Sequence, residues 1–388
     1  MPQITELLIS QIQSIATNYA QNVAEPAHKL IEMREVLLKE DSIIQKFSPV
    51  DITAKSLSAI DGGSLTQQLA GGDLLVTGAT LGEGYHTVPL YPTDESVPAE
   101  TYCEILPHRQ TNTELLSAMR ALIELRVWHK VQSDVRIIDG AYLGNVSTVL
   151  FTLIKGERAT RDVILAYADM DGDAILQDAI KELLVPDVNG SRITIAVPKS
   201  DSSVIYTKHL FDKDDALGFK MTDRNLASVL LHPGEFFEAR TLSTNNVLVE
   251  RLNHVKDTHE SITKSVAPGL MKRLLKGKAE MFEALGKDEL LRTTYFKPSL
   301  WSESAPAIKL EFVYNEKVHG DLNAYTAKIV GTIDADIIDE AIMEPWSQYF
   351  ADRRAKEVSV GADMIKNHLM ATATTSYELT GLTRNYRT

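Results

Sequence analysis

The stretch SAIDGGS, residues 58–64, decides the fold that this sequence predicts. Its β-forming run ends in Asp61, and two glycines follow at once. The stretch VRIIDGAYL, residues 135–143, repeats the pattern with Asp139 before a glycine. A strand that stops at Asp-Gly would place a carboxylate at the open edge of a sheet, because glycine lets the chain turn there. The two stretches therefore predict two acidic side chains at a sheet edge.

A helical pattern over residues 111–131 lies between the two stretches and contains Glu124. Two strand-end aspartates and one helix glutamate can gather three hard oxygen ligands, which Mg²⁺ and Mn²⁺ prefer. Two metal ions held in this way can cleave a phosphodiester. We expect the carboxylates of Asp61, Glu124 and Asp139 to lie within about 4 to 6 Å of one another.

Each of these residues also has a simpler interpretation. Asp-Gly is among the commonest dipeptides of tight turns, so Asp61 and Asp139 could each belong to a hairpin. Glu124 lies beside an apolar helical stripe that includes Leu122 and Leu125, and such a glutamate is usually solvated. Both interpretations stay open at the level of spacing alone.

The composition is that of a globular protein, with 44% hydrophobic and 24% charged residues among 388. This length suits one large domain with insertions, or two domains. The net charge of −13 argues against a protein that coats nucleic acid with its whole surface. A local basic groove beside an acidic centre is still compatible with that charge, because phosphate affinity depends on the local patch.

The location of the protein is predicted from its single cysteine and its N-terminal sequence. Cys103 cannot form a disulfide within the chain, which favours a reducing compartment. The first residues, MPQITE, lack the basic and apolar regions of a signal peptide. The most apolar run, residues 146–154, is too short to span a bilayer. We therefore expect a cytoplasmic protein that does not bind membranes.

The remaining pattern alternates helical and extended segments, which predicts an α/β protein with a mixed sheet. Helices are expected at residues 3–47, 111–131, 158–184 and 226–231, and two more within 334–375, broken near Pro345 and Gly361. Extended segments are expected at residues 56–60, 73–80, 85–91, 101–106, 135–138, 191–197, 203–206, 308–314 and 327–333, and the apolar run 147–154 is rich in β-forming residues.

Three motifs together resemble the NurA family of DNA-end-processing nucleases. They are AIDGGS at residues 59–64, Glu124 within LIEL at residues 122–125, and IIDGAYL at residues 137–143. The resemblance extends over residues 55–372. It implies an RNase H-like mixed sheet flanked by helices, with a helical N-terminal extension (residues 1–50), a nuclease domain (51–375) with a charged insertion at about 254–297, and a tail (376–388).

The family's last helix usually carries an Ala-His pair in the context Pro-x-x-x-x-Ala-His. We match this pair to the stretch VSVGADMI, residues 358–365, where Asp363 stands in place of the histidine. His368 is five residues further on, which turns a helix by about 140°. We therefore predict Asp363, and not His368, as a fourth metal ligand.

The resemblance implies a metal-dependent deoxyribonuclease in which Asp61, Glu124, Asp139 and Asp363 are catalytic and hold two Mn²⁺ or Mg²⁺ ions. It also implies a homodimer that works with a HerA-like hexameric ATPase, in DNA repair or in antiviral defence. A different class of function is also open: a catalytically inactive RNase H-like adaptor that binds a motor ATPase or DNA.

Two regions are candidates for contact with DNA. The stretch ITIAVPKS, residues 193–200, resembles a family strand that ends in a lysine, here Lys199. A lysine-rich stretch further on contributes Lys272, Arg273 and Lys276. Acidic residues alternate with these cations, so a solvated helix face is the alternative interpretation of that stretch.

Overall fold

The computed structural model describes most of the chain with gaps. The described residues are 43–69, 71–91, 93, 96–168, 192–200, 202–210, 221–242 and 291–373, together with residues 9, 11, 12, 14–17, 30, 34, 179, 182 and 183. The expected insertion at 254–297 lies almost wholly outside these ranges, as do most of the N-terminal extension and the tail.

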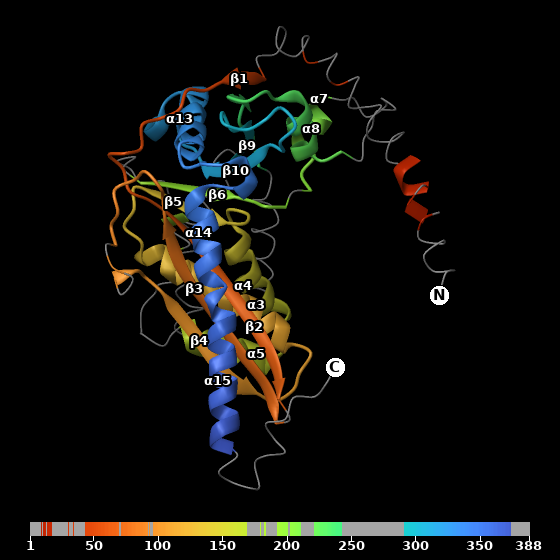
Figure 1. The fold of residues 1–388 in the computed structure, drawn as a ribbon, viewed down its shortest axis with the longest axis vertical. Coiled ribbons are helices and arrows are strands. Elements are labelled where there is room, and N and C mark those ends of the chain that lie inside the picture. Colours follow the sequence, from red (N-terminus) through yellow and green to blue (C-terminus); the bar gives the residue numbers. More distant parts are fainter. Residues whose placement is uncertain are drawn as a thin grey trace.

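The described strands form a single ten-stranded sheet, in the order β1-β7-β9-β10-β6-β5-β2-β3-β4, with β8 paired to β9 (Figure 1). Their bounds are Ile44–Lys46 (β1), Leu57–Leu69 (β2), Gly72–Glu83 (β3), Glu100–Leu106 (β4), Val135–Asp139 (β5), Ile193–Val197 (β6), Glu235–Phe237 (β7), Arg240–Thr241 (β8), Leu291–Lys297 (β9) and Ile308–Val313 (β10).

One half of the sheet has the strand order of an RNase H-like fold. Strands β2, β3 and β4 form an antiparallel meander, and β5 and then β6 add to β2 in parallel. The other half continues from β6 through β10, β9, β7 and β1, which are all antiparallel to their neighbours. The predicted fold class, a mixed sheet flanked by helices, is therefore confirmed.

Helices cover both faces of this sheet. On one face α3 (Asn112–Lys130), α4 (Gly144–Lys155) and α5 (Arg158–Ala168) bury a core with β2, β3 and β5. On the other face α13 (Leu322–Asp334) and α14 (Trp346–Ala355) bury a core with the alternate residues of β2 and β5 and with β6 and β10. The other described helices are α7 (Ile205–Leu210), α8 (Asp223–Leu230), α12 (Glu316–His319), the 3₁₀ helix η3 (Glu340–Ile342) and α15 (Glu357–Ala373).

Three segments that the sequence pattern suggested as extended are helical. Residues 147–154 belong to α4, and 327–333 belong to α13. Residues 205 and 206 of the segment 203–206 begin α7. In α4 the buried residues Val146, Val149 and Leu153 recur at spacings of three and four, so burial of a helical stripe overrides the β preference of valine and threonine.

Three further expectations were wrong. Residues 85–91 form turns and bends and not a strand, and residues 44–46 form β1 and not part of a helix. The last two helices are divided at Lys356, while Gly361 lies inside α15. An isolated glycine weakens a helix by only about 1 kcal/mol, so it did not end this one. No described helix is long and apolar enough to cross a membrane.

Candidate active site

Asp61 and Asp139 stand side by side on two adjacent parallel strands. The paired residues Ile60 and Ile138 end the ladder between β2 and β5, and each aspartate is the next residue. Past this point β5 ends, whereas β2 continues to Leu69. The edge of β2 is therefore open beside Asp61, and the two carboxylates meet at that edge.

The Asp61-Gly62-Gly63 sequence lies inside a strand and is not a turn, and its glycines have a packing role. A Cβ atom on Gly62 would lie 2.4 Å from Oε1 of Glu124 in α3. A Cβ atom on Gly63 would lie 2.2 Å from the backbone oxygen of Ala355, at the end of α14. Since neither space can hold a methyl group, the two glycines let helices approach β2 closely on both faces.

Glu124 reaches this edge from the α3 face, across the space that Gly62 leaves free. Its Oε2 accepts a hydrogen bond of 2.7 Å from Nδ2 of Asn145 in α4. Nε of Arg120 lies 3.5 Å from Oε1. Burial raises the pKa of Glu124 to about 7; Arg120 opposes this shift, and the negative charge of Asp61 adds to it.

Asp61 is also held in an environment that disfavours its charge. Only 8% of the residue is exposed. Burial, together with the neighbouring charge of Asp139, raises its pKa to about 7, and Lys199 opposes the shift. A 2.7 Å hydrogen bond from the amide of Gly62 also favours the charged form. The three carboxylates thus lie near enough for each aspartate to raise the pKa of Glu124.

Lys199 brings a positive charge of the protein itself into the cluster. It follows β6, and its Nζ lies 3.3 Å from Oδ2 of Asp139 and 3.2 Å from Oε2 of Glu344. Burial alone would lower the pKa of Lys199, but Asp139, Glu344 and Asp61 outweigh burial and raise it. Lys199 therefore stays charged and partly neutralises the cluster.

Helix α14 closes the other side of the cluster. Nε2 of Gln348 donates hydrogen bonds to Oδ1 of Asp139 and to the backbone oxygen of Val197. Asp352, one turn further along, is near enough for its charge to raise the pKa of Asp61. Oε1 of Gln348 is buried and has no hydrogen-bond partner among the described residues. A buried acceptor of this kind indicates a missing donor or cation beside Asp139.

The predicted fourth ligand, Asp363, lies elsewhere, and this prediction is corrected by the structure. Its Oδ1 accepts a 3.0 Å hydrogen bond from Gln67, six residues past Asp61 along β2. Six residues of a strand span about 20 Å. Both Asp363 and His368 are exposed on α15. The charge that reaches Asp61 from this part of the chain comes instead from Asp352.

The sequence contained a signal for Asp352 that our alignment missed. Ala351-Asp352 follows Pro345 with five residues between, one more than in the Pro-x-x-x-x-Ala-His context. The stretch that we matched, residues 358–365, contains no proline. Gln348 and Glu344 have no comparable signal. The predicted DNA contacts Lys272, Arg273 and Lys276 lie outside the described residues.

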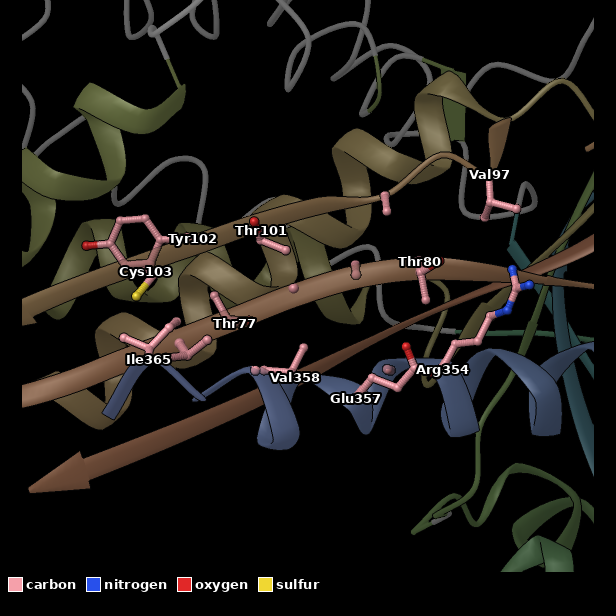
Figure 2. A pocket seen from close by; sticks show the side chains of 16 residues that line it. Thr77, Thr80, Val97, Thr101, Tyr102, Cys103, Arg354, Glu357, Val358 and Ile365 are labelled. Carbon is pink, nitrogen blue, oxygen red and sulfur yellow. The ribbon is translucent and has the colours of Figure 1, made fainter. Parts of the chain in front are cut away.

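A cavity of about 490 Å³ lies between β3, β4, the end of α14 and α15. Figure 2 shows Thr80 and Arg354 at one end and Cys103 and Ile365 at the other, between β3, β4 and the last two helices. None of Asp61, Glu124 and Asp139 lines this cavity. Thr80, the cross-strand partner of Asp61, is in the lining, so the cavity borders the strand pair that carries Asp61 but does not contain the three carboxylates.

The donor set fits a hard divalent cation, although the side chains do not form a complete set of ligands. Among the described residues, no group of three or more histidine, cysteine or acidic side chains is arranged to hold a metal ion. Each carboxylate instead bonds to a neighbour: Asn145, Lys199 or the Gly62 amide. The carboxylate oxygens of Asp61, Glu124 and Asp139 are the hard ligands that Mg²⁺ and Mn²⁺ prefer. Burial, with a smaller contribution from neighbouring carboxylates, raises the pKa of Asp61 and Glu124.

The fold and this site define a class: an α/β protein with an RNase H-like sheet that gathers carboxylates at one strand edge. Its structural neighbours are NurA nucleases. The NurA nuclease from Sulfolobus solfataricus has 14% sequence identity and a TM-score of 0.53, over 96% of this chain and 98% of that one. This similarity shows the fold.

Two other NurA structures are also similar in outline. One has 10% identity and a TM-score of 0.47, over 97% of this chain and 99% of its own. The other, NurA with manganese, has 11% identity and a TM-score of 0.40, over 94% of this chain and 97% of its own. No family model matches the chain, and no curated protein is similar to it.

Proposed function

We propose that this protein is a metal-dependent deoxyribonuclease of the NurA type. The observation that carries the proposal is the meeting of Asp61, Glu124 and Asp139 at the open edge of β2. Burial raises the pKa of Asp61 and of Glu124, the charge of Asp139 raises both further, and the charge of Asp61 also raises that of Glu124. Acidic groups whose pKa is strongly raised by burial and by neighbouring charges cluster at functional sites. The NurA fold agrees with this reading.

The residues that would hold one or two Mn²⁺ or Mg²⁺ ions are Asp61, Glu124 and Asp139, with Asp352 in the role first predicted for Asp363. Bound divalent ions would supply Lewis-acid stabilisation of the attacking and leaving oxygens in phosphodiester hydrolysis. We propose this two-metal chemistry for the site.

The chain's own residues have definable tasks in this reaction. Gln348 fixes the orientation of Asp139 through its amide. Asn145 does the same for Glu124. Lys199, whose side chain is 45% exposed, can swing from Asp139 towards a phosphate of the DNA backbone once a metal ion neutralises that carboxylate. Because Asp61 and Glu124 are buried, few water molecules can compete with a metal ion for their carboxylate oxygens.

The proposal extends to partners. We propose DNA as the substrate, a homodimer as the working form, and a HerA-like hexameric ATPase as the motor that delivers the DNA, in repair or in antiviral defence. The alternative function, a catalytically inactive adaptor, is favoured by two observations: Lys199 already contacts Asp139, and no complete ligand group is formed among the described residues.

The test is a cleavage assay on linear duplex and single-stranded DNA, with MnCl₂, with MgCl₂ or with EDTA. We expect cleavage with either metal ion, none with EDTA, and loss of at least 100-fold in Asp61→Asn. Asp363→Asn is the matched control, because it makes the same change at an exposed site, and it should cleave like the wild type. A folded wild-type protein that binds DNA but never cleaves it would support the adaptor.

A further inference from the structure

The outer face of α14 carries a row of aromatic rings in mutual contact. The ring centroids of Trp346 and Phe350 lie 6.0 Å apart with the planes at 7°. Tyr349 lies 5.8 Å from Trp346. Tyr85, from the turn after β3, lies 5.6 Å from Trp346, edge to face. We call these four residues, Tyr85, Trp346, Tyr349 and Phe350, the α14 aromatic face.

This face is accessible to solvent and is not part of the core. Tyr85 is 56% exposed, and the three helix residues are partly exposed. None of the four belongs to a core cluster of the described residues. Aromatic side chains of this size normally dominate cores and interfaces, so four of them together at a surface indicate a binding surface.

A buried aspartate fixes the position of the face. Asp336 is fully buried, and its Oδ1 accepts a 3.1 Å hydrogen bond from the amide of Tyr85. Its Oδ2 accepts a 3.0 Å bond from the amide of Ser347, and its backbone oxygen accepts one of 2.8 Å from Trp346. The turn after β3 and the start of α14 are thus joined through one residue, which holds Tyr85 beside Trp346.

Positive charge lies at the end of the aromatic row. The guanidinium carbon of Arg354 is 4.7 Å from the centre of the Phe350 ring, a cation–π contact. Arg353, the preceding residue, is exposed. Arg354 also donates a 3.3 Å hydrogen bond to the backbone oxygen of Leu81. In a chain with a net charge of −13, these two arginines place local positive charge beside the stacked rings, which favours an anion there.

The same helix carries the aromatic face and part of the candidate active site. Gln348 contacts Asp139, and Tyr349 is the next residue, turned by about 100°. Asp352 influences Asp61, and Arg353 follows it directly. A strand that lies on the outer face of α14 therefore needs to pass only around one side of the helix to reach the carboxylates.

We propose that the α14 aromatic face stacks the unpaired bases of a DNA strand and holds that strand beside the carboxylate cluster. This inference rests on the proposed nuclease function for its choice of DNA. Every nucleobase has a flat π-surface, so such a platform binds without sequence preference, and arginine contributes cation–π and phosphate contacts. Bases inside a duplex are already stacked, so the face should prefer single strands.

Intrinsic fluorescence tests this proposal directly. The chain has three tryptophans. Trp128 and Trp301 are only 1% and 4% exposed, which leaves Trp346 as the accessible reporter. We expect a 15-nucleotide oligo-dT to quench the fluorescence of the metal-free protein in EDTA, where cleavage does not occur. A duplex of equal length should quench much less.

Variants show which residue produces the fluorescence quenching and how much that residue contributes to the affinity for oligo-dT. Trp346→Phe should lose the quenching and keep the affinity measured by fluorescence anisotropy of labelled oligo-dT. Trp346→Ala should weaken that affinity about tenfold, as expected for one lost stacking contact. Tyr85→Ser, on an exposed turn, is a second variant if Trp346→Ala does not fold, and it should weaken binding in the same direction. Trp301→Phe is the control that should keep the quenching.

The outcomes separate this proposal from the nuclease proposal. DNA cleavage together with unchanged oligo-dT affinity in both Trp346→Ala and Tyr85→Ser would overturn the stacking role and leave the nuclease intact. Quenching by oligo-dT in a protein that never cleaves DNA would support the face and refute the nuclease. A shift of Trp346→Ala to a smaller species in size-exclusion chromatography, with unchanged oligo-dT affinity, would make the face an interface between copies and overturn the proposal.

Discussion

Nζ of Lys199 lies 3.3 Å from Oδ2 of Asp139, so a cation of the protein itself is in contact with the acidic cluster. The same ammonium lies 3.2 Å from Glu344 and opposes the raised pKa of Asp61. A divalent ion and Lys199 would thus neutralise the same carboxylates. This relationship makes the stability of the metal-free protein depend on Lys199.

The first prediction concerns this lysine. Lys199→Gln should lower the unfolding free energy of the metal-free protein by about 1 kcal/mol, a modest value because the side chain is half exposed and solvent screens it. Saturating Mn²⁺ should raise the melting temperature of Lys199→Gln more than that of the wild type, because the metal replaces the lost charge. Differential scanning fluorimetry with and without EDTA measures both effects, with Lys199→Arg as the charge-conserving control. If Mn²⁺ raised the melting temperature of all three proteins equally, Lys199 and the metal ion would not neutralise the same carboxylates.

The second prediction concerns pH. The pKa of Asp61 is about 7 in the folded protein, against a reference value of 3.8. The folded state therefore holds this proton more tightly, and the unfolding free energy falls as pH rises from about 4 to about 7. Asp61→Asn cannot ionise, so at pH 8 in EDTA it should be more stable than the wild type by about 1 to 3 kcal/mol.

Urea unfolding at pH 5 and pH 8 measures this difference. The advantage of Asp61→Asn should be large at pH 8 and small at pH 5, and the variant should also lose most of the Mn²⁺-induced shift in melting temperature. If its stability relative to the wild type were the same at both pH values, the buried carboxyl of Asp61 would not have a raised pKa.

The third prediction distinguishes the two candidates for the fourth acidic position. Asp352→Ala should lower the cleavage rate at least tenfold and weaken Mn²⁺ binding, since Asp352 acts on Asp61. Asp363→Ala removes only an exposed hydrogen bond to Gln67. Its cleavage rate should therefore equal that of the wild type, and its unfolding free energy should stay within about 0.5 kcal/mol of the wild-type value. Initial cleavage rates over a Mn²⁺ titration decide between them. The reverse result would restore the original alignment of the last helix.

The fourth prediction compares a glycine of β3 that lies under α14, Gly82, with a glycine inside α15, Gly361. A Cβ atom on Gly82 would lie 2.3 Å from the backbone oxygen of Ser347 and 2.5 Å from the amide nitrogen of Ala351. Gly82→Ala must therefore displace α14, and we expect a loss of about 1 to 3 kcal/mol together with much of the activity. Gly361 is inside α15 with nothing within 4 Å, so Gly361→Ala should stabilise by about 0.5 to 1 kcal/mol. Urea denaturation of both variants tests the pair, and a stable, active Gly82→Ala would show that α14 does not pack as described.

The sequence alone was sufficient for the order of elements around the three predicted acids. Glu124 on a long helix and Asp139 at the end of a later strand agree with the structure, whereas the strand expected to end at Asp61 continues as β2 to Leu69. Such patterns are local: alternation and helical periodicity arise within a few residues, and short motifs report them. The mixed α/β fold class follows from the same local patterns.

Only the tertiary structure decided what Gly62 and Gly63 do and which residues contact the acidic side chains. Asp61-Gly62-Gly63 looks like a turn in sequence, yet it is a strand onto which two helices pack closely. Gln348 meets Asp139 across 209 residues of chain, and no periodicity reports a contact of that range. Whether Asp352 or Asp363 lies near Asp61 likewise depends on which turn of α14 or α15 crosses β2 beside that residue. The packing of these helices against the whole sheet sets that position.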